Sequence, residues 1–200
     1  MSKINIKKRM RLLLVMLSLT AFAFIIPTNT GTENEVIVWQ KDRPLTWDDF
    51  KGKPAKRFAV ASTNYDINKI IEQVGKDSST VEIKAIFFCN KSWKKQDWID
   101  ETVLAHEQKH FDIVELYARK LRKMVASKTY TSFNDLKTKS DSLYAVIDKA
   151  MDVYQDEYDE KTEGSMNGEQ QRLWNKKIID QIKELDNYSS SIMKVGFQKK

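Results

Sequence analysis

The chain has 200 residues, of which 34 are basic and 28 acidic, and it contains a single cysteine, Cys89. A chain of this length fits one domain with a short appendage. One cysteine excludes an intramolecular disulfide, so a hydrophobic core has to hold the fold. The simplest interpretation of Cys89 itself is a small buried residue in a strand.

The first 26 residues have the layout of a secretory signal peptide. Five basic residues precede Leu12, and the 15 residues from Leu12 to Ile26 are apolar apart from two hydroxyl side chains. This pattern predicts an exported protein, located in the periplasm, in the cell envelope or outside the cell. An uncleaved membrane anchor is the alternative, although the run is shorter than the roughly 20 residues that a spanning helix needs. We expect no membrane span in the mature chain.

Without this segment the charge of the chain is nearly balanced, because five basic residues and no acidic residue are removed with it. A protein with so little net charge is not expected to bind nucleic acid. The sequence makes no prediction of the oligomeric state.

The mature chain changes from strand-forming to helix-forming sequence. Stretches rich in β-branched and aromatic residues predict three strands, at residues 35–39, 58–67 and 80–89. Helical periodicity and capping residues then predict three long helices, from Asp97 to about Ser127, from Ser132 to Gly164 and from Asn167 to about Asn187. Strands followed by helices indicate an α+β fold. We expect one domain over residues 33–188 and a C-terminal tail over residues 189–200, in which no element is predicted.

The first predicted helix carries both histidines of the chain, His106 and His110, with Glu107 directly after the first. Residues four apart project from the same side of a helix, so the two imidazoles can bind one zinc ion. Glu107 and His110 also fall on the apolar stripe of this helix, where an ionisable group is costly unless it is paired or binds a metal. His-Glu-x-x-His is the signature of zinc hydrolases, in which zinc lowers the pKa of a bound water and the glutamate acts as general base. The alternative is a structural pair of histidines at the edge of the core, with a salt-bridged glutamate.

A catalytic zinc site needs a third protein ligand, and no other histidine remains to supply it. Asp112 is on the same helix but faces away from the pair, which predicts a structural role. The acidic end of the second helix is a better source, because Asp159 and Glu163 are one turn apart and can both face the first helix. A solvated helix end is the alternative. Tyr158 is a candidate hydrogen-bond donor to an oxyanion, or else a core residue.

Three stretches of the chain resemble the bacterial DUF922 family of exported, zincin-like metalloproteases: residues 45–54 (LTWDDFKGKP), 104–119 (LAHEQKHFDIVELYAR) and 158–164 (YDEKTEG). The resemblance implies a zincin-like fold, with a small, mostly antiparallel N-terminal sheet followed by three long helices. It also implies Zn²⁺ as cofactor, with His106 and His110 as ligands and Glu107 as general base. A further implication is that the strand at residues 81–89 lies along the substrate cleft, where an extended peptide can pair with its edge.

The chain departs from the family pattern at one place. The pattern YDxxTxHG has a histidine after the residue that matches Glu163, and this chain has Gly164 there. If that histidine is a ligand, Asp159 or Glu163 can replace it, since two histidines and one carboxylate form known zinc sites. The leading hypothesis is an exported zinc-dependent peptidase or related amide hydrolase that acts on a peptide or protein. The alternative is a pseudoenzyme of the same fold that serves as a binding module in the cell envelope.

Overall fold

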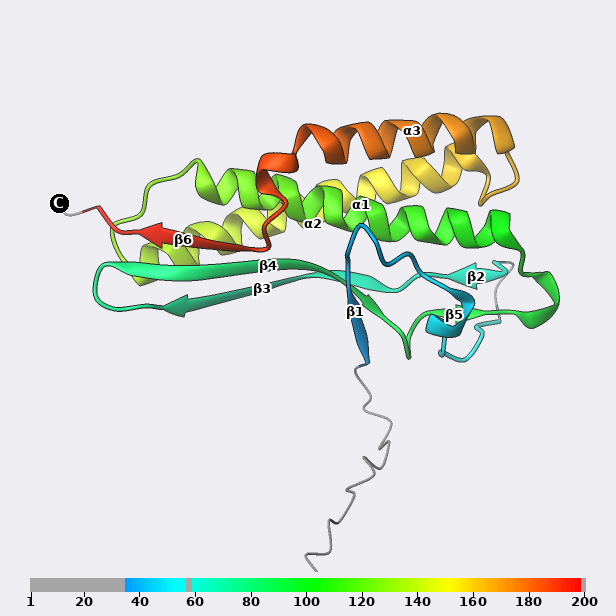
Figure 1. The fold of residues 1–200 in the computed structure, drawn as a ribbon, viewed down its shortest axis with the longest axis horizontal. Coiled ribbons are helices and arrows are strands. Elements are labelled where there is room, and N and C mark those ends of the chain that lie inside the picture. Colours follow the sequence, from blue (N-terminus) through cyan, green and yellow to red (C-terminus); the bar gives the residue numbers. More distant parts are fainter. Residues whose placement is uncertain (1–34, 57–58, 199–200) are drawn as a thin grey trace, which may run out of the picture. The chain divides into compact units, whose positions relative to one another are not determined.

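A computed structural model of the chain describes residues 35–56 and 59–198. The predicted signal peptide, residues 1–26, lies outside these ranges and stays a prediction. The described residues form a four-stranded antiparallel sheet, a second sheet of two short strands, and three long helices (Figure 1). The predicted α+β class is therefore confirmed. Within the described ranges, no helix combines the length and the apolar character that a membrane crossing requires.

The four-stranded sheet is organised around its longest strand, β4 (Ser78–Phe88). β3 (Tyr65–Gln73) pairs with one edge of β4, while β1 (Val36–Val38) and β6 (Ile192–Gly196) pair with the two ends of the other edge. Because both edges of β4 have strand partners, the expectation that a peptide pairs with the edge of this strand is wrong.

The second sheet consists of β2 (Ala61–Ser62) and β5 (Trp93–Lys94). The sequence predicts one strand over residues 58–67, whereas the structure has β2, a break at residues 63–64, and then β3, which continues to Gln73. The pairing partner changes at the break, from β5 to β4. Strand pairing depends on distant residues, so the local β-branched pattern does not reveal this change.

The sequence of the central strand has apolar residues at every second position from Val81 onward, which predicts one buried face, and the structure confirms it. The apolar residues at every second position of β4 have at most 1% of their surface exposed: Val81, Ile83, Ala85 and Phe87. The ring of Phe87 contacts that of Phe111 in α1 (Glu101–Ala126), with the ring centroids 5.8 Å apart. Burying a side chain of this size stabilises the fold by roughly 1.5–3 kcal/mol. The sheet and the first helix therefore share one hydrophobic core.

Each long helix begins at a side chain that accepts a hydrogen bond from its first turn. The caps are Asp100 for α1, Ser132 for α2 (Phe133–Thr162) and Asn167 for α3 (Gly168–Glu184). The second and third caps are those predicted, but the first is not. Asp97 lies in a separate 3-10 turn that ends at the extended residue Ile99, and the carboxylate of Asp100 accepts from the N–H of Val103 at 2.8 Å.

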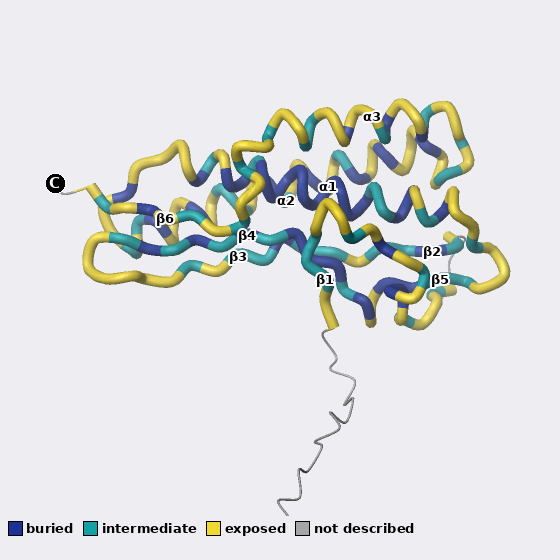
Figure 2. Tube along the Cα trace, viewed as in Figure 1, coloured by how far each residue is buried: buried dark blue, intermediate teal, exposed yellow. Residues whose placement is uncertain are grey.

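The first helix packs against the sheet and against both other helices, and α2 also contacts β3 (Figure 1). Sixteen of its 26 residues are buried, and Figure 2 shows this helix as a largely buried element. A surface helix buries only one stripe. The buried residues of α1 include seven that are polar or charged: His106, Glu107, His110, Asp112, Glu115, Arg119 and Arg122.

The last strand, β6, lies in the C-terminal segment for which the sequence predicts no element. Only Val195 of this strand is buried, so its apolar pattern is too weak to predict a strand. The strand forms because the edge of β4 at residues 78–82 offers unpaired backbone groups, which β6 satisfies.

The carboxylate of Asp49 holds a turn that precedes the sheet of β2 and β5. It accepts hydrogen bonds from the backbone N–H of Thr46 at 2.8 Å and from the guanidinium of Arg43 at 2.8 and 3.1 Å. Burial raises the pKa of Asp49, but the hydrogen bonds from Arg43 and Thr46 outweigh burial and hold the pKa below its usual range.

We expect Asp49→Asn to lower the free energy of unfolding by about 1–2 kcal/mol at neutral pH, because charge-assisted hydrogen bonds are lost. Since the folded-state pKa is lowered, the wild-type contribution is present above the unfolded pKa of about 3.9 and is lost as the pH falls further. Urea titrations at neutral and acidic pH measure both effects. Equal stability of the two proteins at neutral pH would contradict this role of Asp49.

Candidate metal centre

The N-terminal half of α1 presents the predicted histidine pair to the end of α2 and the start of α3. His106, Glu107 and His110 have only 3%, 5% and 8% of their surface exposed. The two imidazole rings are nearly perpendicular, with their centroids 4.8 Å apart, and their Nε2 atoms approach to 3.2 Å. The four-residue spacing therefore directs one nitrogen of each ring at the same point.

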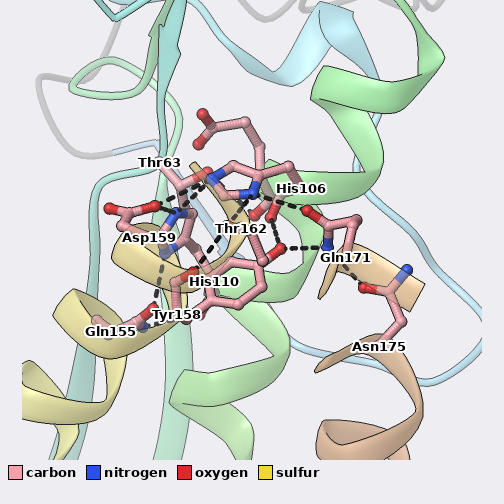
Figure 3. A network of polar contacts seen from close by, with 10 residues as sticks. Thr63, His106, His110, Gln155, Tyr158, Asp159, Thr162, Gln171 and Asn175 are labelled. Atoms are coloured by element: carbon pink, nitrogen blue, oxygen red, sulfur yellow. Dashed lines mark hydrogen bonds and ion pairs between the residues drawn. The ribbon is translucent and has the colours of Figure 1, made fainter. Parts of the chain in front are cut away.

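Asp159, in the last turn of α2, completes the group (Figure 3). Its Oδ1 lies 3.0 Å from Nε2 of His106 and 3.0 Å from Nε2 of His110. The two nitrogens and the oxygen thus form a nearly equilateral triangle. Among the residues that the structure describes, no other set of three His, Cys, Asp or Glu side chains brings its ligand atoms together in this way.

This triangle fits a divalent metal ion of the zinc type. Zinc with four ligands at roughly 2.0–2.1 Å holds neighbouring ligand atoms about 3.3 Å apart. Two imidazoles and one carboxylate are also a donor set of catalytic zinc sites, in which the fourth position stays open. His106, His110 and Asp159 are therefore the residues that can hold a metal ion here.

Two glutamines determine which nitrogen of each histidine faces the triangle. The side-chain oxygen of Gln155 lies 2.7 Å from Nδ1 of His110, and that of Gln171 lies 3.0 Å from Nδ1 of His106. An amide oxygen accepts but does not donate, so each Nδ1 carries a proton. In the neutral histidines, each Nε2 then directs a lone pair at the triangle, where it faces the lone pairs of Asp159. A bound cation removes the repulsion among these three acceptors.

The other hydrogen bonds of the glutamines fix the orientation of their amide groups. The amide nitrogen of Gln155 donates to the backbone carbonyl of His110 at 3.0 Å. The amide nitrogen of Gln171 donates to Asn175 at 2.7 Å and to the hydroxyl of Tyr158 at 2.6 Å. Both oxygens are therefore left to face the histidines, and the network extends over all three helices.

The charges around the triangle favour a proton on His110 and a negative charge on Asp159. Burial lowers the pKa of His110, but the hydrogen bond with Asp159 and the negative charge of Glu107 outweigh burial and raise it. Burial raises the pKa of Asp159, yet the hydrogen bonds from His106 and His110 hold that pKa well below its usual range. A metal ion therefore binds in competition with a proton on the histidine pair.

Tyr158 is fully buried against the histidines. Its ring stacks on that of His106 with centroids 4.7 Å apart and meets the edge of the His110 ring at 5.1 Å. Its hydroxyl accepts from Gln171 and donates to the backbone carbonyl of His106 at 3.3 Å. Burial raises its pKa above the usual range, so the phenol stays neutral. The oxyanion role predicted for Tyr158 does not agree with this geometry, and we assign it a positioning role instead.

Glu107 has a buried oxygen, Oε2, with no hydrogen-bond partner among the described residues. An unsatisfied buried polar atom costs about 1–3 kcal/mol, and more if it is charged. Glu107 also lines a cavity of about 390 Å³, together with the triangle, Tyr65, Asp156 and the extended segment at residues 59–63. The residue with this unpaired oxygen therefore belongs to the wall of the cavity, next to the triangle.

Two predicted acidic residues lie away from the triangle. Glu163 has the left-handed conformation that ends α2, with φ of 51°, and its exposed carboxylate accepts from the side chain of Asn167. The structure thus brings Asp159, and not Glu163, to the histidines. Asp112 accepts a hydrogen bond from the indole of Trp39 at 2.9 Å, which agrees with the structural role predicted for it.

Gly164, where the family pattern has a histidine, lines the same cavity. Its φ of 57° favours glycine, and a Cβ atom there would meet no other atom within 4 Å. The missing histidine does not leave the pair without a third group, because Asp159 supplies one.

The sequence alone did not identify Gln155, Gln171 or Tyr65 as site residues. Each glutamine interrupts the buried apolar stripe of its helix, which is the same signal that marked Glu107 on α1. That signal would have identified the two glutamines. Tyr65, at the start of β3, reaches the cavity only because the chain changes sheets just before it.

The fold and the site together define an α+β protein with a candidate metal centre on its central helix. The chain belongs to the family described as bacterial protein of unknown function (DUF922), whose family model matches residues 42–168. The matched range contains the whole of α1 and α2, and therefore the complete triangle. Comparisons with curated proteins and with solved structures found no match.

We expect Gln171→Met to weaken zinc binding by roughly 10- to 100-fold, because His106 loses the acceptor that fixes its Nδ1 proton. Gln181→Met is the matched control, since Gln181 lies on the same helix but accepts from Tyr154. Calorimetric titration with zinc measures both variants, with melting curves as a check on folding. Equal losses of zinc affinity in the two variants would contradict the role of Gln171.

The zinc affinity of the wild type should also fall as the pH decreases through the raised pKa of His110, because zinc then displaces a proton.

Proposed function

We propose that the protein is an exported zinc-dependent peptidase or related amide hydrolase, with a zincin-like arrangement of its active site. One observation carries the proposal: three ligand atoms lie within 3.2 Å of one another, next to Glu107, which has a buried carboxylate oxygen without a partner among the described residues. A purely structural histidine pair does not require an unpaired glutamate next to it. Export is proposed from the layout of the first 26 residues.

The residues divide the chemistry of such a reaction among them. His106, His110 and Asp159 would hold the metal ion, which supplies Lewis acidity that activates water and polarises the substrate carbonyl. Glu107, which lines the cavity beside the triangle, would accept the proton of the attacking water on its carboxylate and pass it to the leaving amine. The glutamines and Tyr158 keep the two imidazoles in place throughout.

Tyr65 is the better candidate for a hydroxyl that contacts the substrate. It lines the cavity, and no hydrogen bond within the described part of the chain engages its hydroxyl. Burial, and then the negative charges of Asp152 and Asp159, raise its pKa above the usual range, so it remains a proton donor. A donor of this kind can stabilise the negative charge that develops on the substrate carbonyl oxygen.

The shape of the cavity favours a peptide as substrate. One wall is the extended segment at residues 59–63, which includes β2. In the described structure β2 pairs only with β5, so its other edge keeps unpaired backbone groups. An extended polypeptide can pair with such an edge. The strand that lines the cavity is thus β2, whereas the family resemblance implied the strand at residues 81–89.

We expect Glu107→Ala to lower kcat for peptide hydrolysis by about 10²- to 10⁴-fold, because the general base is lost, while zinc binding is retained. Glu157→Gln is a control on the neighbouring helix, since Glu157 is exposed and does not line the cavity. Elemental analysis and a quenched fluorescent peptide library measure metal content and activity.

Two results would redirect the proposal. If purified protein contains no zinc, and chelators change neither activity nor melting, the metal centre is excluded. If zinc is bound but no peptide is cleaved, the alternative of a pseudoenzyme that binds a partner in the cell envelope gains support. That alternative predicts partner binding that survives His106→Ala.

We expect Tyr65→Phe to lower kcat by about 10²-fold with little change in KM, as for loss of one oxyanion donor. Zinc affinity should not change, because Tyr65 makes no contact with the histidines in the described network. Steady-state kinetics and zinc titration on the same preparation separate the two effects. A change in KM alone would assign Tyr65 to substrate binding instead.

A further inference from the structure

A row of aspartates extends along α2 away from the cavity, formed by Asp148, Asp152 and Asp156. The four-residue spacing places them on one face of the helix, and Asp156 lines the cavity. No hydrogen bond or ion pair within the described residues engages any of the three carboxylates. Like charges at this spacing destabilise a helix, so the row has an energetic cost that no internal partner offsets.

The described residues that line the cavity include carboxylates but no permanently cationic side chain. Lysine and arginine are both absent from the described residues that line the cavity, whereas Glu107, Asp156 and Asp159 all belong to that lining. Burial, followed by the charges of Asp152 and Asp66, raises the pKa of Asp148. The carboxylates are therefore close enough to affect one another.

The part of α2 that precedes the row shows how a cationic side chain is bound next to a carboxylate and an aromatic ring. Lys69 of β3 forms an ion pair with Asp141 of α2 and lies 5.6 Å from the centre of the Tyr144 ring. The cavity has a similar combination, because the ring of Tyr65 lies near the carboxylates of Asp152 and Asp156. There, no lysine is found among the described residues that line the cavity.

The row does not form a second metal site. In the described ranges, the triangle of His106, His110 and Asp159 is the one group whose ligand atoms converge on a point. Charges that are spread along a helix face suit an extended ligand. Independently of the row, Glu107 lines the same cavity, has only 5% of its surface exposed, and has a carboxylate oxygen with no hydrogen-bond partner among the described residues.

We propose that the site takes polypeptides that carry a lysine or arginine close to the bond at the metal centre, and that Asp152 and Asp156 bind this side chain. The inference deepens the proposed function and rests on it. A cationic side chain relieves the repulsion along the row and can lie against the ring of Tyr65. An acidic side chain adds to that repulsion, so the row selects by rejection as well as by attraction.

The test uses quenched fluorescent peptides that are identical except for lysine, glutamine or glutamate at the positions flanking the central bond. With the zinc-loaded full chain, we expect kcat/KM for the best lysine peptide to exceed that of its glutamate counterpart by about tenfold or more, because several carboxylates act on one charge. The preference should decrease with added salt, since these groups are partly exposed.

Charge variants then locate the preference. In the double variant Asp152→Asn/Asp156→Asn, the ratio of kcat/KM for the lysine peptide to kcat/KM for the glutamine peptide should fall toward one. In Glu157→Gln this ratio should stay as in the wild type. Glu157 is the matched control, because it lies on the same helix and its charge acts on Tyr117 and Tyr154 instead. Equal rates for lysine and glutamate peptides, or a preference that survives in the double variant, would overturn the inference.

A second readout separates this inference from the proposed function. Fluorescence anisotropy measures the binding of the same peptides to zinc-loaded Glu107→Gln. If no peptide is cleaved by the wild type but lysine peptides still bind this variant more tightly, catalysis fails and the cationic ligand class stands. If binding shows no charge preference, the inference fails whatever the activity. Calcium that stabilises the wild type but not the double variant would identify the row as a cation site and would also overturn it.

Discussion

The structure depends on one constraint: its central helix, α1, is largely buried, yet it carries ionisable residues along much of its length. A buried charge is tolerated only when it is paired. In the C-terminal half of the helix, Glu115 accepts hydrogen bonds from Arg119 at 2.8 Å and from Arg122 at 2.9 Å. Arg122 also donates to the backbone carbonyl of Ile83 at 2.7 Å, which links the helix to the central strand. In addition, Arg119 donates to Asp186 at 2.8 Å, so each of these charged groups has a partner within the protein.

The N-terminal half of the same helix meets the constraint differently. His106 and His110 each have one nitrogen satisfied by a neutral amide, while the other nitrogens and the Asp159 carboxylate face one shared point. Glu107 has a buried oxygen with no hydrogen-bond partner in the described part of the chain. The unpaired oxygen of Glu107 and the two Nε2 atoms that face the shared point thus all belong to the part of the helix that borders the cavity. A site that binds a cation and transfers a proton needs polar groups that are not fully satisfied within the protein, and a purely structural network does not.

The proposed roles of the carboxylates differ because their surroundings differ. Asp159 lies 3.0 Å from Nε2 of both histidines, which is the position of a metal ligand. Glu107 is buried and has an oxygen without a partner among the described residues, which agrees with the role of a general base. Asp152 and Asp156 are exposed, so they suit a charged side chain of a substrate that arrives from solvent. One negative cavity can in this way combine metal binding, proton transfer and substrate selection.

The sequence by itself determined the features that depend on neighbouring residues. It placed His106 and His110 on one side of a helix, and Glu107 and His110 on its apolar stripe, because helical spacing is a local property. It located the start of α2 and of α3 from their caps. It also fixed the buried face of β4 through alternation. Only the tertiary structure decided between Asp159 and Glu163, supplied the two glutamines, and covered both edges of β4 with β3, β1 and β6. Those features are contacts between segments far apart in the chain, and their geometry is set by how the helices and strands pack, which no local pattern encodes.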